Sequence, residues 1–156
     1  MQSYLKMVVY GKMVKMKEES VTKSIIKYLK QNGWNIFSYD FPQSGTGFFI
    51  HPNDRSDKIK KAIVPDIIAN KESTCIIMEN KSYYYEKDFI KLDNLKNDAS
   101  FSNDLNSILK KLNCNNIKYG IGLPLKDFLK NKSEEHLALV DFIITVDDSK
   151  NCKKYL

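Results

Sequence analysis

Cysteine, histidine and arginine are scarce in this chain of 156 residues. The few cysteines and histidines argue against a disulfide framework and against a zinc site. The three cysteines, Cys75, Cys114 and Cys152, are odd in number and lie far apart. They therefore predict neither a disulfide framework nor a CxxC metal site, and two histidines do not complete a zinc centre. Free thiols are typical of a reducing compartment, which predicts a cytoplasmic location.

Long hydrophobic runs are also missing. No apolar run approaches the roughly 20 residues that cross a bilayer, and lysines interrupt the segment from Met1 to Met16. We therefore expect neither a membrane span nor a signal peptide. No repeat, low-complexity tract or Pro/Gly-rich linker divides the chain, so residues 1–156 are expected to form one domain. Its core would cover about 18–146, after a basic N-terminal segment at 1–17.

Lysine supplies nearly all of the net charge of +6, because Arg55 is the one arginine. Residues 1–32 hold seven lysines against Glu18 and Glu19, whereas residues 124–156 hold six basic and six acidic residues. A basic lobe of this kind suits a polyanion such as nucleic acid. A solvated basic surface explains the same charge equally well, and lysine-rich usage is also typical of AT-rich genomes.

Hydrophobic periodicity predicts an α/β fold with a central mixed β-sheet flanked by helices. The expected helices cover residues 18–31, 88–95, 102–112 (with Ser102 as its N-cap) and part of 125–137. The expected strands cover residues 34–41, 62–69, 74–81, 117–123 and 139–146, with a hairpin turn at 70–73 and a short further strand around 48–50. The order begins αβββαβ and continues with a partial helix and a strand.

Two acidic residues interrupt the apolar runs of neighbouring strands. Asp66 lies inside AIVPDIIA and Glu79 near the end of TCIIMENK. A buried carboxylate costs several kcal/mol unless it is paired or binds a metal. The hairpin would bring Asp66 close to Glu79, and Lys81 shares the face of Glu79 because residues i and i+2 of a strand point the same way. Two carboxylates and an ammonium suit Mg²⁺-assisted hydrolysis of a phosphodiester.

The stretch Pro65-Asp66, twelve further residues and then Glu79-Asn80-Lys81 resembles the PD-(D/E)xK nuclease motif. The element order is similar to the restriction-endonuclease-like core of that superfamily. The resemblance implies a metal-dependent DNA endonuclease with Asp66, Glu79 and Lys81 as catalytic residues. It further implies that Asp66, Glu79, Asn80 and a glutamate of the first helix bind Mg²⁺, for which Mn²⁺ can substitute.

The first helix offers two glutamates for that role. Glu18 lies in line with Val21 and Ile25 on a helical wheel and therefore faces the sheet. Glu19 lies about 100° away and has Lys23 four residues on as an exposed ion partner. We expect Glu18 to be the catalytic and metal-binding glutamate, with Glu19 as the alternative.

DNA contacts are expected from the basic first helix and from an insertion loop over 43–61. The loop could reach into a groove, glycine amides within it could approach the backbone, and a tyrosine after the motif could stack on DNA. The candidate DNA-binding residues are Lys23, Lys27, Gly45, Arg55, Lys58, Lys60, Lys61 and Tyr83.

The compact size and the loop favour a type II restriction-type endonuclease that cuts duplex DNA as a homodimer, because cutting both strands calls for two copies. A Holliday-junction resolvase or repair nuclease of the same fold, acting on branched DNA, is an open alternative. So is a non-catalytic DNA-binding module. In the simplest alternative, Glu79 and Lys81 form an ordinary ion pair, and Asp66 is a turn residue before a strand that begins at Ile67.

Overall fold

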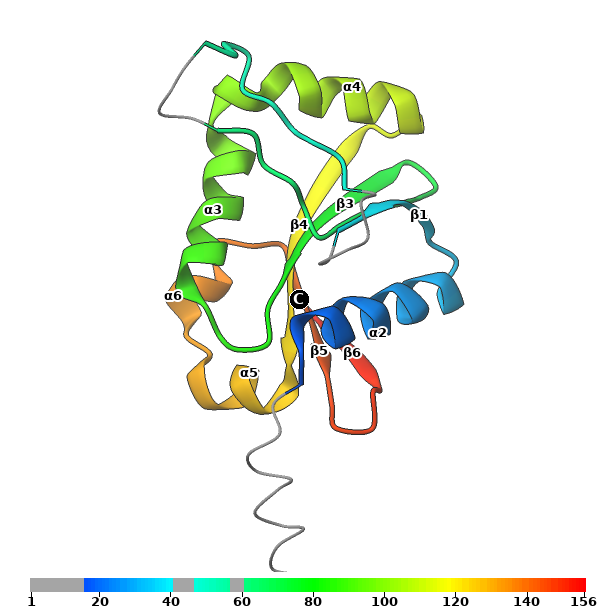
Figure 1. Cartoon of the computed structure of the whole chain (residues 1–156), viewed down its shortest axis with the longest axis vertical. Coiled ribbons are helices and arrows are strands. Elements are labelled where there is room, and N and C mark those ends of the chain that lie inside the picture. The colour runs from blue at the N-terminus through cyan, green and yellow to red at the C-terminus, as the bar shows by residue number, and fades with distance from the viewer. Residues whose placement is uncertain (1–15, 41–46, 57–60) are drawn as a thin grey trace, which may run out of the picture.

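The computed structural model describes residues 16–40, 47–56 and 61–156, so the predicted DNA-binding residues Gly45, Lys58 and Lys60 lie outside the described residues. The described chain forms a six-stranded sheet whose strands follow the chain order, from β1 at one edge to β6 at the other. Helix α2 covers one face of the sheet, and α3 and α4 lie on the other (Figure 1). The predicted mixed sheet flanked by helices is confirmed.

The strands β3, β4 and β5 run parallel, and the other neighbouring strands pair antiparallel. The strands are β1 (Asn35–Tyr39), β2 (Ile67–Lys71), β3 (Thr74–Asn80), β4 (Asn116–Pro124), β5 (Phe142–Val146) and β6 (Cys152–Tyr155). The helices are α2 (Glu18–Gln31), α3 (Glu86–Asn97), α4 (Ser102–Leu112), α5 (Leu125–Asn131) and α6 (Glu134–Leu137), and a 3₁₀ turn, η1 (Ala99–Phe101), precedes α4.

Helix α2 has the predicted bounds, because its apolar stripe and its stop signal are both strong. Val21, Ile25 and Leu29 recur at helical spacing and are buried against the sheet. The helix ends before Gly33, which has a φ of 85° that favours glycine. Acidic residues in its first turn are favourable next to the positive end of the helix dipole.

Side chains of β3 alternate between two apolar clusters, and this alternation positions the site. Ile77 packs with α3 and α4, whereas Met78 packs with α2. Glu79 therefore projects toward the side of α3, and Asn80 projects toward α2.

Several predicted boundaries around the hairpin are wrong. Strand β2 begins at Ile67 and continues to Lys71, so the turn is the two-residue pair Glu72-Ser73 rather than residues 70–73. Glu72 takes a positive φ of 53°, as tight hairpin turns require. The strand expected around 48–50 is reduced to an isolated bridge between Ile50 and Ile63.

The C-terminal part of the sheet also differs from the prediction. Strand β5 begins at Phe142, and β6, which was not predicted, pairs antiparallel with β5 and extends the sheet beyond residue 146. Two exposed lysines in β6 hide its strand pattern. Ser102 is the first residue of α4 and not its N-cap, and Asp98 caps the preceding 3₁₀ turn. Within the described ranges, no helix is long and apolar enough to span a membrane.

Candidate active site

Asp66 and Glu79 lie across from each other on neighbouring strands. The regular β2–β3 pairing ends at Ile67 and Met78, and the amide of Asp66 donates to the carbonyl oxygen of the same Met78 at 3.0 Å, so the pairing becomes irregular just before the two acids. The two side chains nevertheless lie close together, because, besides burial, the charge of Asp66 raises the pKa of Glu79, and a side-chain hydrogen bond with Glu79 acts on the pKa of Asp66. The structure therefore brings the two carboxylates together on one side of the sheet.

Main-chain hydrogen bonds hold Asp66 in place. Its Oδ2 accepts from the amide of Asn80 at 2.6 Å, and its carbonyl oxygen accepts from the amide of Asp40 at 2.9 Å. Because β2 begins at Ile67, Asp66 stands just before the strand, as the structural alternative proposed. Its carboxylate thus also anchors the end of β3.

Burial is the main cause of raised pKa values in the carboxyl pair. Burial, reinforced by the charge of Asp66, raises the pKa of Glu79 to about 8, although Lys91 of α3 opposes the shift with its Nζ 2.8 Å from Glu79 Oε1. Burial likewise raises the pKa of Asp66 to about 6, against the hydrogen bond from the Asn80 amide, and Glu18 adds to the rise. Additional positive charge at this pair would favour the ionised carboxylates.

Lys81 meets Glu18 and not Glu79. Its Nζ lies 3.6 Å from Glu18 Oε1, and 5.3 Å above the centre of the Tyr85 ring. Although burial opposes it, the carboxylates of Asp88 and Glu18 raise the pKa of Lys81, which keeps the side chain an ammonium.

The two candidate glutamates of α2 point to different partners. Glu18 faces Lys81, whereas Glu19 pairs with Lys23 at 2.9 Å across one helical turn. The predicted pair of Glu19 with Lys23 is present, whereas Glu18 and Glu19 have equally exposed side chains, at 40% each. Lys23, a predicted DNA contact, holds this ion pair with a side chain that is 61% exposed.

Asp88 and Lys91 of α3 belong to the site, and the sequence does not predict either of them. Asp88 is 5% exposed, and its Oδ2 has no hydrogen-bond partner among the described residues. Burial raises the pKa of Asp88, while Lys81 and Lys91 oppose the rise. The signal was present in the sequence, because Asp88 precedes the buried Leu92 by four residues and so lies on the apolar face of the helix.

The side chain of Asn80 does not lie where the predicted metal ligand should be. Its side chain is fully buried against α2, where Nδ2 donates to Thr22 Oγ1 at 3.0 Å. Strand alternation thus separates its side chain from Asp66 and Glu79, which rules out the side chain as a metal ligand beside them. The main chain of Asn80 still takes part, through its amide bond to Asp66.

A metal site here would rest on two carboxylates. In the part of the chain that the structure describes, no three His, Cys, Asp or Glu side chains cluster closely enough to hold a metal ion. The converging donors are the oxygens of Asp66 and Glu79. Mg²⁺ is often held by one or two carboxylates, with waters and phosphate oxygens completing its shell, so this donor set fits Mg²⁺ or Mn²⁺.

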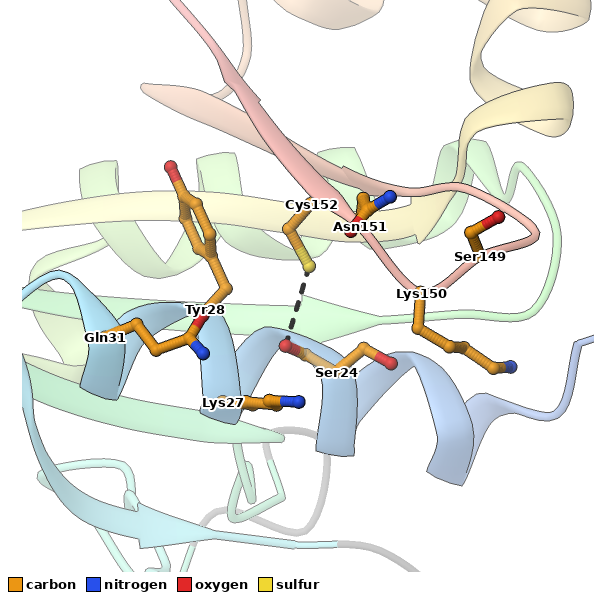
Figure 2. Close-up of a pocket in the computed structure, with 8 residues that line it drawn as sticks. All are labelled: Ser24, Lys27, Tyr28, Gln31, Ser149, Lys150, Asn151 and Cys152. Carbon is orange, nitrogen blue, oxygen red and sulfur yellow. Dashed lines mark hydrogen bonds between the residues drawn. The ribbon is translucent and has the colours of Figure 1, made fainter.

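Lys27, another predicted DNA contact, lines a polar groove of about 310 Å³ between α2 and the β5–β6 hairpin (Figure 2). Lys150 lines the same groove from the hairpin, and its Nζ donates to Ser20 Oγ at 3.3 Å. Ser20 stands two residues after Glu18, so this lysine lies close to the first turn of α2. The groove thus carries two lysines, Lys27 and Lys150.

The remaining described DNA candidates fall at different places. Tyr83 is 43% exposed, and its ring lies 5.6 Å from Tyr85, beside Lys81. Arg55 and Lys61 are exposed. Asn53, two residues before Arg55, is anchored to the carbonyl oxygens of residues 99 and 100, so the structure places this part of the loop beyond the C-terminal end of α3 and not at the acidic pair.

The site is defined by the positions of Asp66, Glu79 and Lys81 in this structure. Asp66 and Glu79 lie together, but the ion pairs join Lys81 to Glu18 and Lys91 to Glu79, and the resemblance to PD-(D/E)xK nucleases stays a prediction. A scan against protein-family models finds no match, and a search of curated proteins finds none either.

Proposed function

We propose that this chain is a metal-dependent DNA endonuclease that hydrolyses phosphodiester bonds. The observation that carries the proposal is the juxtaposition of Asp66 and Glu79 at the end of the β2–β3 pairing, where the two carboxyl groups interact directly. A buried and a half-buried acid with raised pKa values, next to a lysine at the same strand end, favour a functional site over a purely structural one.

Each residue of the site has its own role in the proposed reaction. Asp66 and Glu79 would hold Mg²⁺ or Mn²⁺, which supplies a Lewis acid for the phosphate and lowers the pKa of a bound water. Lys81, as an ammonium, is placed to offset phosphate charge, and Glu18 fixes its side chain. Tyr83, exposed beside Lys81, is placed to contact the nucleic acid.

DNA is the proposed substrate because of the charge of the chain and the position of its lysines. The net charge of +6 and the groove with Lys27 and Lys150 next to α2 suit a phosphate backbone. Within this class we propose a type II restriction-type enzyme acting on duplex DNA as a homodimer, since one chain carries one acidic pair and two strands have to be cut.

Nicking of supercoiled plasmid DNA tests the proposal. Wild-type protein should convert the plasmid to open-circle and linear forms in Mg²⁺ and leave it intact in EDTA. The Lys81→Ala protein should lose at least about 100-fold in rate, as expected for the loss of electrostatic stabilisation in the transition state. Discrete fragments from a long natural DNA would indicate sequence specificity, and preferential cutting of a four-way junction would instead indicate a resolvase.

A non-catalytic DNA-binding module is the second candidate, and one observation favours it. Lysines already pair with two of the acids, Lys91 with Glu79 and Lys81 with Glu18, which satisfies their charge without a metal. DNA binding that persists in EDTA, without cleavage in Mg²⁺ or Mn²⁺, would support the module and contradict the nuclease.

A further inference from the structure

Lys91 holds the position at Glu79 that a cation would take. Its Nζ lies 2.8 Å from Glu79 Oε1, and the Glu79 side chain is only 6% exposed, so no second cation can approach this oxygen freely. The lysine also acts on Asp66 and Asp88, since its charge opposes the pKa rise of both. Lys91 is thus the shared counter-ion of the buried acids.

An alternative acceptor for this ammonium stands on the same helix. Asp88 precedes Lys91 by three residues, a spacing at which two helix side chains can meet. Its buried Oδ2 has no hydrogen-bond partner among the described residues. The Lys91 side chain is 38% exposed and has a long, flexible stem, so it can move without unpacking the core.

We propose that Lys91 is an exchangeable internal counter-ion, which a divalent cation displaces from Glu79 and which then pairs with Asp88. This inference rests on the proposed function, because it takes Asp66 and Glu79 as the metal-binding pair. Lys91 is a positioning residue in this account. It neutralises the acids when metal is absent, and it opposes metal binding by occupying Glu79.

The affinity for Mn²⁺ tests this role, because a counter-ion and a purely structural lysine predict opposite changes in affinity when Lys91 is replaced. Mn²⁺ binding is measured by isothermal titration calorimetry at pH 8.5, without DNA, for wild type, Lys91→Met and Lys91→Arg. Removing the competing charge should tighten binding by at least about fivefold in Lys91→Met, because like charges repel strongly at a buried site. Lys91→Arg keeps the charge and should bind as weakly as wild type. Lys87→Met, on the exposed face of the same helix, is the matched control and should not change.

A purely structural lysine would give the opposite sign, since losing it would distort the site and weaken Mn²⁺ binding. Unchanged or weaker binding by Lys91→Met, with wild type binding normally, would overturn the counter-ion role and leave the nuclease proposal standing. No binding by any of the proteins would overturn the nuclease proposal and this inference with it. If Lys91→Met does not fold, Lys91→Gln replaces it, with the same expected sign.

A double-mutant cycle tests the exchange with Asp88. Asp88→Asn should weaken Mn²⁺ binding in the wild-type background, because the displaced ammonium loses its acceptor, and should weaken it much less in the Lys91→Met background. Equal effects in the two backgrounds would show that Asp88 acts only by its charge, and would overturn the exchange step.

Discussion

Glu79 is the residue on which burial and charge act most strongly in this structure. It stands among apolar strand residues, faces Asp66 and has one cationic partner in Lys91. Burial raises the pKa of Glu79 to about 8, above its ordinary value of 4.5. Because the folded state then binds this proton more tightly than the unfolded chain, Glu79 destabilises the fold increasingly as the pH rises from about 4.5 to about 8.

Glu79→Gln should therefore become more stable than wild type as the pH rises. In EDTA, the difference in free energy of unfolding should grow by roughly 4 kcal/mol between pH 5 and pH 8.5, in favour of the variant. Urea denaturation at the two pH values measures it. A difference that does not change with pH would show that the Glu79 carboxyl is not held protonated by the fold.

Sequence alone predicts the strand acids but not their cationic partner. Asp66 and Glu79 stand out because each interrupts an apolar run. Lys91 does not, because half-exposed lysines are common on helices, and its pairing with Glu79 depends on how α3 packs against the sheet. The ion pair of Glu18 with Lys81, similarly, joins elements that only the tertiary fold brings together.

At the scale of elements, the close contact of α2 with β4 fixes the end of β3. A Cβ on Gly122 would lie 2.2 Å from Asn80 Oδ1 and 2.3 Å from Ile25 Cδ1. Helix α2 can approach the sheet at this point because Gly122 has no side chain. Asn80 is the residue whose amide holds Asp66, so this contact also affects the acidic pair.

Gly122→Ala should destabilise the protein by roughly 1–3 kcal/mol, because both contacting groups are buried and cannot move freely. Thermal unfolding measures the loss. Ile25→Val, added to Gly122→Ala, removes one of the two clashes, so the pair of substitutions should cost less than the sum of the single ones. Strict additivity would contradict the predicted contact.

The bounds of the elements follow from the sequence where local signals are strong. Helices α2 and α4 have the predicted residues, because their apolar stripes are regular and each ends at a turn-forming residue. The sequence does not predict β6, because CKKY exposes both of its lysines, and it places the start of β2 too early, because residues 62–65 are apolar without forming a strand. Pairing with neighbouring strands decides such cases, and local pattern does not carry that information.

At the scale of the whole molecule, the positive charge of the chain is the main support for a nucleic acid partner. The groove between α2 and the β5–β6 hairpin is lined by Lys27 and Lys150, and Lys150 lies near the first turn of α2, where Glu18 meets Lys81. Each lysine that contacts a phosphate releases counterions when DNA binds, so its contribution depends on salt.

Replacing both Lys27 and Lys150 by alanine should weaken duplex DNA binding and lower the slope of log affinity against log salt by about 2. Fluorescence anisotropy in EDTA, over a series of salt concentrations, measures both without cleavage. Lys110→Ala, on the exposed face of α4 across the sheet, is the control and should leave the slope unchanged. An equal loss in the control would point to diffuse attraction rather than to this groove.

We propose that the Asp66–Glu79 pair binds the metal ion required for DNA cleavage. The most direct measurement is the rate of plasmid nicking against Mg²⁺ concentration for wild type, Asp66→Asn and the exposed control Asp148→Asn, with folding verified for each. We expect Asp66→Asn to lose at least about 100-fold in rate at every Mg²⁺ concentration while still binding DNA, and Asp148→Asn to match wild type. Wild-type rates for Asp66→Asn, or no Mg²⁺-dependent nicking by the wild type, would contradict the claim.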